Sequence, residues 1–204
     1  MLRRDLIDGV LAGVMVSFGG TVLLSCDNRY YGALLFCIAL LAICYFGFNL
    51  YTGRVGFLAL DHSGAALRTA FLGLLGNFLG TLFMGALIPA ALPALRTAAQ
   101  AACEARLGQL PGQTLLRGCF CGVLMYIAVW VYREKHSVLG VLFCIPVFVL
   151  SGFEHSIADM FYFSLAGWVF RPRSLVFLLL VVLGNSLGGL FIPLLQRLRG
   201  EGTP

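Results

Sequence analysis

The sequence predicts an all-α membrane protein with six transmembrane helices in two inverted three-helix repeats. Three observations predict it: the composition, six long apolar segments, and short motifs that recur in both halves. Of the 204 residues, 60% are hydrophobic and 11% are charged, and the mean hydropathy is +0.93. A soluble domain carries about 45–50% apolar and about 25% charged residues. Charged side chains this sparse cannot cover a soluble surface, so lipid must cover much of it.

Six segments are long and apolar enough for a helix that crosses the bilayer, which takes about 20 residues. They are residues 7–26, 32–60, 65–94, 113–132, 138–170 and 174–196. The polar stretches between them contain Asp27-Asn28-Arg29, Asp61-His62, Glu104-Ala105-Arg106, Arg133-Glu134-Lys135 and Arg171-Pro172-Arg173. Residues 1–204 are therefore predicted to be one transmembrane domain.

The basic residues predict which side the termini face, because cytoplasmic loops carry an excess of Lys and Arg. Six spans put both termini on one side. The terminal side would hold Arg3, Arg4, Arg54, Arg68, Arg133, Lys135, Arg197 and Arg199. The other side would hold Arg29, Arg96, Arg106, Arg117, Arg171 and Arg173. We therefore expect cytoplasmic N and C termini in a multi-pass protein of the cell (cytoplasmic or inner) membrane. Basic residues scattered in this way do not indicate a nucleic-acid partner.

The second and fifth segments are too long for one helix and are interrupted. Residues 47–53 read GFNLYTG, and residues 151–160 read SGFEHSIADM. Backbone that is not helical is tolerated at membrane depth only where protein or a water-filled cavity meets its polar groups. The sequence thus predicts a broken helix in each half of the chain.

The two halves, approximately residues 1–98 and 113–198, share motifs in the same order. Gly9 and Gly13 match Gly118 and Gly122, residues 47–49 match residues 152–154, and Gly76-Asn77 matches Gly184-Asn185. The offsets are 109, 105 and 108 residues. Because each half has three spans, the second must be inverted relative to the first. Inverted repeats place broken helices near the midplane, where transporters bind their substrates.

His155 is the candidate functional residue within the fifth span. An ionisable side chain inside a span suggests function, and an imidazole can change its charge near neutral pH. The half-helices that restart after each break offer backbone N–H groups and positive dipole ends, which suit a small anion. Glu154 is expected to satisfy freed backbone donors at the break. Asp159 could cap a helix, pair with the imidazole or face a neighbouring subunit.

The stretch GFEHSIADMF, together with NLYTG and LGNSLGG, resembles the formate/nitrite transporter family, which includes formate, nitrite and hydrosulfide channels. With LAGVMVSFGG in the first span, the resemblance extends over essentially the whole chain. It implies an aquaporin-like fold, a homopentamer with one pore per subunit, and no cofactor.

The resemblance also implies roles for individual residues. His155 matches the central pore histidine, and Thr52 matches a threonine that hydrogen-bonds near it. The remaining pore positions would be Leu50, Tyr51, Phe36, Leu40, Phe148 and Asn185, with Asn49, Glu154 and Asp159 in support. Arg106 falls, by spacing, on a lysine that the family often has in its outer vestibule. Gly122 and Asp159 depart from the family pattern, in which asparagine is usual at both positions.

The sequence therefore predicts a channel or proton-coupled transporter for a small monovalent anion of a weak acid: formate, nitrite or hydrosulfide. An alternative is a membrane-embedded enzyme or sensor that uses His155 and Glu154 as acid and base. No catalytic motif or metal-binding set accompanies them, and the seven cysteines fall mostly in apolar runs. A neutral-solute pore is a third alternative, although the paired Asn-Pro-Ala signatures usual in such pores are absent.

Overall fold

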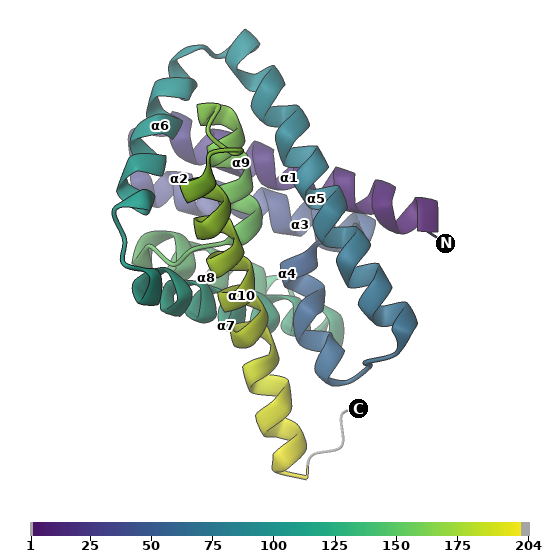
Figure 1. Cartoon of the computed structure of the whole chain (residues 1–204). Coiled ribbons are helices and arrows are strands. Elements are labelled where there is room, and N and C mark those ends of the chain that lie inside the picture. Colours follow the sequence, from purple (N-terminus) through teal and green to yellow (C-terminus); the bar gives the residue numbers. More distant parts are fainter. Residues whose placement is uncertain (1, 201–204) are drawn as a thin grey trace.

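The computed structural model describes residues 2–200, and these residues form helices and no strand (Figure 1). The elements are α1 (Leu2–Ser25), α2 (Arg29–Leu35), α3 (Cys37–Phe46), α4 (Tyr51–Arg54), the 3₁₀-helix η1 (Val55–Ala59), α5 (Gly64–Ala91), α6 (Ala94–Leu107), α7 (Pro111–Lys135), α8 (Leu139–Ser151), α9 (Ser156–Ala166) and α10 (Pro172–Leu198).

Five stretches of helix are long and apolar enough to cross a membrane: α1, the segment Arg29–Phe46 that contains α2 and α3, α5, α7 and α10. The pair α8 and α9 makes a sixth if it is one span, bent by 54° at its break. This confirms the prediction of an all-helical membrane protein, and the count of five or six candidate spans among residues 2–200 compares with the six predicted.

Both breaks begin at a glycine in the left-handed backbone region, which suits glycine because it has no Cβ. Gly47, with φ of 71°, ends α3, and Gly152, with φ of 69°, ends α8. The chain then runs extended for a few residues before α4 and α9 begin. The structure thus interrupts the two segments in which the sequence predicts a break.

The connection between the third and fourth spans differs from the sequence prediction, which made it a polar hairpin. It contains α6, a helix of 14 residues. Leu95, Ala99 and Cys103 are buried on one face of α6, which packs against α9. The prediction was wrong because this helix is amphipathic: the polar residues on its other face lowered the average hydropathy of the segment.

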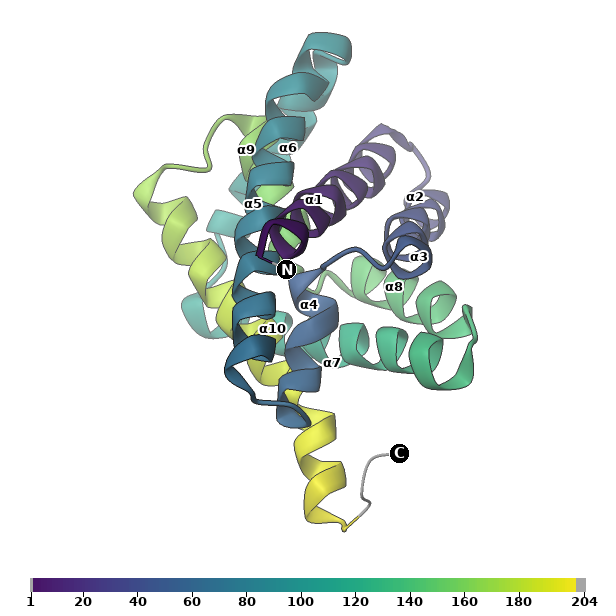
Figure 2. The same ribbon diagram turned by 90° about the vertical axis from the view of Figure 1, so that its right-hand side faces the viewer.

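Two helix pairs cross at close range, α1 with α5 and α7 with α10. A Cβ added at Gly76 would lie 2.6 Å from the carbonyl oxygen of Leu6, and one at Gly184 would lie 2.5 Å from that of Leu115. These distances are below van der Waals contact, so both crossings require glycine. Figures 1 and 2 show α5 and α10 as long, nearly straight helices.

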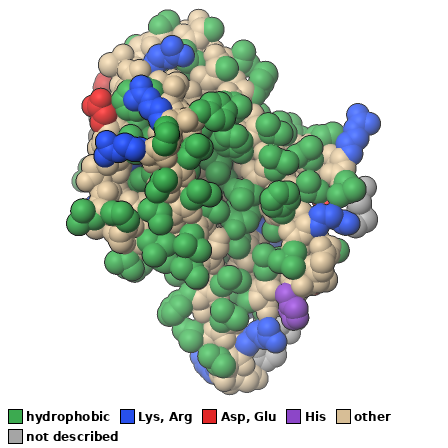
Figure 3. Space-filling model, viewed as in Figure 1, with side chains coloured by type: hydrophobic (Ala, Val, Ile, Leu, Met, Phe, Trp, Pro, Cys, Tyr) green, Lys and Arg blue, Asp and Glu red, His purple; other side chains and the backbone are tan. Residues whose placement is uncertain are grey.

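Apolar side chains cover much of the surface in the view of Figure 3, whereas Lys and Arg gather toward its margins. Large side chains such as Phe71 and Leu179 are more than 60% exposed. An exposed apolar face this large marks contact with lipid or with another protein.

Candidate functional site

Asn77 on α5 holds the break in the first half of the chain. Its side-chain Oδ1 accepts a hydrogen bond from the backbone N–H of Tyr51 (2.9 Å). Its Nδ2 donates to the carbonyl oxygens of Gly9 (2.8 Å) and Asn49 (2.9 Å). One buried carboxamide therefore satisfies backbone groups on both sides of the break and ties it to α1.

Asn185 on α10 does the same for the second break. Its Oδ1 accepts from the N–H of Ser156 (2.8 Å), and its Nδ2 donates to the carbonyl oxygens of Gly118 and Glu154, both at 2.9 Å. Sequence reasoning placed Asn185 in the pore and left Asn77 out of the candidate site. The recurrence of Gly-Asn in both halves was the signal that could have included Asn77.

His155 lies at the start of α9, where it joins the two halves. Its Nδ1 accepts from the backbone N–H of Ala158 (3.2 Å), and its Nε2 lies 2.8 Å from Oγ1 of Thr52. A ring nitrogen that accepts carries no proton, so the hydrogen-bond network assigns the proton of the neutral ring to Nε2. The ring stacks on Phe148 with centroids 5.6 Å apart, and His155 is 3% exposed.

The His155–Thr52 pair lies between two cavities. Residues lining the first, of about 390 Å³, include Phe36, Phe148 and His155. Leu40 and Leu50 are among those lining the second, of about 280 Å³. The structure thus brings all of the predicted apolar pore residues except Tyr51 to one of the two cavities.

Tyr51 and Asn49 line neither of these cavities. The Tyr51 hydroxyl lies 2.7 Å from Ser186 Oγ on α10. Asn49 Nδ2 donates to the carbonyl oxygens of Asp5 (3.1 Å) and Thr69 (2.8 Å). Both side chains anchor the first break to its neighbours.

Arg106 joins the two acidic candidates at the first cavity. Its Nε lies 2.8 Å from Asp159 Oδ1 and 3.1 Å from Glu154 Oε2, and Gln109 Nε2 donates to Glu154 Oε1 (2.5 Å). Burial would lower the pKa of this guanidinium, but the two carboxylates outweigh burial and raise its pKa above the ordinary value.

This cluster corrects two expectations. Glu154 was expected to satisfy backbone donors at the break, but its carboxylate binds Arg106 and Gln109. Arg106 was matched to a vestibule lysine of the family, but two carboxylates accompany its single charge. Asp159 takes a partner that the sequence alternatives did not include. The cluster forms because α6 packs on α9 and brings residue 106 beside residue 159.

Two arginines that sequence reasoning missed supply positive charge to the first cavity. Arg29 and Arg117 both line it. Among residues 2–200, no carboxylate lies within 4.0 Å of either guanidinium, and Arg29 donates to the carbonyl oxygen of Val149 (2.9 Å). Their positions at the ends of predicted spans gave no sign that both would face the same cavity.

Comparisons with known proteins agree with this architecture. A family model described as "Formate/nitrite transporter" matches residues 2–197. The nitrite transporter NirC of Salmonella typhimurium is 28% identical over 178 residues, and the match covers 76% of this chain and 64% of NirC. The uncharacterized transporter YwcJ of Bacillus subtilis is 25% identical over 217 residues, with 92% of this chain and 85% of YwcJ covered. The chain thus spans less than two thirds of the length of that NirC.

Two solved structures share the fold. An FNT family ion channel superposes with a TM-score of 0.83 at 24% identity, covering 100% of this chain and 90% of the channel. A pentameric formate channel with formate bound gives a TM-score of 0.83 at 23% identity, covering 98% and 97%. The family match over nearly the whole chain confirms the resemblance read from the GFEHSIADMF motif. This chain belongs to the formate/nitrite transporter family.

Proposed function

We propose that the protein is a channel or proton-coupled transporter, and not an enzyme, for a small monovalent anion of a weak acid. Formate and nitrite are the foremost candidates and hydrosulfide is the third. The observation that carries this proposal is the His155–Thr52 pair, enclosed between two cavities that each contain arginine side chains. The NirC relatives are nitrite transporters, and one solved structure holds formate.

The enclosed pair suits a weak acid because its surroundings disfavour charge. Phe36, Phe148, Leu40 and Leu50 are each at most 4% exposed, and passage beside them requires an anion to lose water, which is costly for a charged group. A proton taken up on the way removes that charge. The imidazole Nε2–H and the Thr52 hydroxyl are the donors placed to meet the substrate at this point.

Several further features belong to the same proposal. Each subunit of a homopentamer would hold its own pore and need no cofactor, and the apolar surface would meet lipid and the other subunits. Both termini would lie on the cytoplasmic side of the cell membrane. The matched roles of Asn77 and Asn185 support two inverted repeats, since each carboxamide bonds one break and one glycine of the paired helix.

The test of the proposed function is flux of formate, nitrite and hydrosulfide into liposomes as a function of pH, in wild-type protein and His155→Asn. Asparagine is a good helix N-cap, so this variant keeps the bond to Ala158 while it removes the imidazole. We expect uptake in wild type to rise as external pH falls, because more of the substrate can cross as its acid.

In His155→Asn we expect flux to fall at least about tenfold, which corresponds to about 1.4 kcal/mol on the barrier, or its pH dependence to flatten. Size-exclusion chromatography checks that the variant assembles. A well-assembled His155→Asn with the wild-type rate and pH profile would refute the role of the imidazole. Equal flux of a neutral solute such as glycerol would refute an anion pathway.

A further inference from the structure

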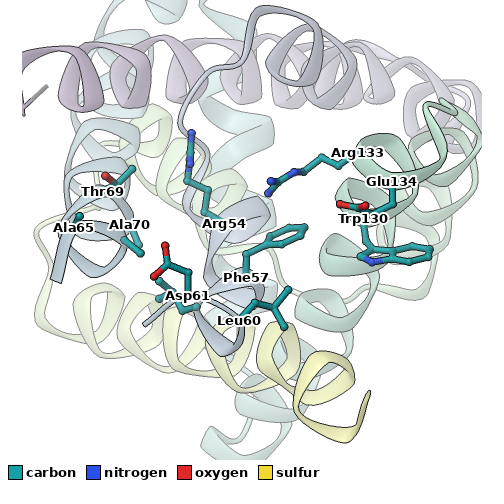
Figure 4. A pocket seen from close by; sticks show the side chains of 12 residues that line it. Arg54, Phe57, Leu60, Asp61, Ala65, Thr69, Ala70, Trp130, Arg133 and Glu134 are labelled. Carbon is teal, nitrogen blue, oxygen red and sulfur yellow. The ribbon is translucent and has the colours of Figure 1, made fainter. Parts of the chain in front are cut away.

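A second pair of arginines lies on the other side of the His155–Thr52 pair. Arg54 and Arg133 line the 280 Å³ cavity beyond Leu50. The same two residues also line a third cavity, of about 500 Å³, between α4, η1, α5 and α7 (Figure 4). They therefore stand where two cavities meet, on the side of the molecule where α1 begins.

Neither side chain has a carboxylate partner in the part of the chain that the structure describes. The Arg133 guanidinium carbon lies 4.3 Å from the centroid of the Phe57 ring, and Figure 4 shows it extending over this ring toward the middle of the cavity. Arg54 follows Thr52 by two residues on α4. Among residues 2–200, no Asp or Glu oxygen lies within 4.0 Å of either guanidinium.

Four acidic residues lie near the two arginines, but none of the four lines the 280 Å³ cavity. Asp61 and Glu134 line only the 500 Å³ cavity, and the Asp61 carboxylate accepts from the backbone N–H of Ser63. The charged groups that act on Arg54 are Arg133, Asp5 and Asp8, and Asp8 pairs with Arg4. Among residues 2–200, no acidic residue lines the 280 Å³ cavity.

We propose that Arg54 and Arg133 form a binding site for a small monovalent oxyanion or carboxylate. Two guanidinium groups that have no paired carboxylate repel each other, and an anion between them relieves this repulsion. The planar fork of arginine donors matches a carboxylate or a nitrite. The site lies beyond Leu50, opposite the cavity that holds Arg106. Its part in transport rests on the proposed function, whereas anion binding there does not.

Trp130 offers a test of binding that needs no transport, because it lines the 500 Å³ cavity with both arginines. The chain has two tryptophans, and Trp168→Phe leaves Trp130 as the only one. Iodide, a small monovalent anion, quenches indole fluorescence on contact, and acrylamide does so without charge. Quenching by both is measured on the detergent-solubilised full chain, with and without Arg54→Gln and Arg133→Gln together.

We expect the iodide quenching constant of Trp130 to fall at least about threefold in the double variant, because a charged cleft concentrates counter-ions. Acrylamide quenching should stay the same, which shows that access to the ring has not changed. Arg68→Gln is the matched control: it removes one exposed positive charge at the start of α5 and lines none of these cavities. Arg54→Lys with Arg133→Lys should restore most of the iodide effect.

A second experiment measures transport in membrane vesicles of both orientations, with the formate concentration varied on one side of the membrane at a time. The double variant should raise the half-saturating formate concentration several-fold on the Arg54 side only. Arg117→Gln should raise the half-saturating concentration only on the opposite side.

An iodide quenching constant that is unchanged in the double variant would overturn the site. A lowered iodide constant with unchanged half-saturation on both sides would overturn its part in transport. If wild-type protein carried neither formate nor nitrite, the proposed function would fail, and the quenching comparison would still decide whether anions bind.

Discussion

Arg106 shows how one buried charge can hold three segments together. It bonds Asp159 at 2.8 Å and Glu154 at 3.1 Å, and its guanidinium lies 4.8 Å from the centroid of the Tyr162 ring. Its side chain is 23% exposed, and those of Glu154 and Asp159 are 5% and 1% exposed. Removing the cation would leave two carboxylates buried without compensation, so Arg106 is first a structural residue.

Arg106→Gln should therefore destabilise the protein by about 3–5 kcal/mol, the usual cost of breaking a buried ion pair from one side. Thermal unfolding followed by size-exclusion chromatography measures this loss. Adding Asp159→Asn should recover part of it, because one uncompensated carboxylate is removed. If Arg106→Gln were as stable as wild type and lost flux only at low salt, Arg106 would be a vestibule cation after all.

At the scale of secondary-structure elements, the two asparagines and the glycine crossings fix the broken helices. Each asparagine meets one backbone N–H and two carbonyl oxygens. Each glycine crossing lets a long helix approach its partner closely enough for those bonds. The breaks are therefore supported by neighbouring helices and are not flexible gaps.

Asn77→Leu and Asn185→Leu should destabilise the protein to a similar extent. A buried backbone group left without a partner costs about 1–3 kcal/mol, and each substitution strands three such groups. The thermal midpoint of the assembled protein in detergent is the measurement. Ser174→Ala is the control, because it removes a buried hydroxyl of α10 that has no hydrogen-bond partner among residues 2–200. A loss in one variant and none in the other would contradict the inverted-repeat proposal.

Gly188→Leu should prevent α7 and α10 from packing, since a Cβ at this position would overlap the carbonyl oxygen of Cys119. Small residues of this kind allow close helix contacts in membranes. We expect loss of assembled protein on size-exclusion chromatography before any change in selectivity. Gly64→Leu, where nothing lies within 4 Å of an added Cβ, is the control. Normal assembly of Gly188→Leu would show that the crossing tolerates side chains.

At the scale of the whole molecule, arginines line both of the cavities that flank the His155–Thr52 pair. Arg29 and Arg117 line the first cavity, and Arg54 and Arg133 line the one beyond Leu50. Between them lies the His155–Thr52 pair, among apolar side chains. Under the proposed function, positive charge at both ends would attract an anion, and the low-dielectric middle would favour its neutral acid.

Arg117→Gln should lower formate flux at low ionic strength and have little effect at high ionic strength. The residue acts through the local concentration of anions, and salt screens this attraction over about 10 Å at 0.1 M. Flux at two salt concentrations measures it, with Arg96→Gln, an exposed arginine of α6 that does not line the cavity, as the control. A reduction of flux that is the same at both salt concentrations would assign Arg117 a structural role.

The sequence by itself determined the class of the protein, the extent of most spans and the position of both breaks. These properties are local: about 20 apolar residues predict a span, and a glycine followed by polar residues predicts a break. The GFEHSIADMF motif added the family. None of these inferences required knowing which distant residue lies beside which.

Only the tertiary structure decided the partners. Arg106 and Asp159 are 53 positions apart and meet because α6 packs on α9. Arg54 and Arg133 come from different halves of the chain and share two cavities. Asn185 satisfies a break and does not line either cavity beside His155. Contacts between residues so far apart leave no periodic trace in the sequence, because they depend on how whole helices pack against one another.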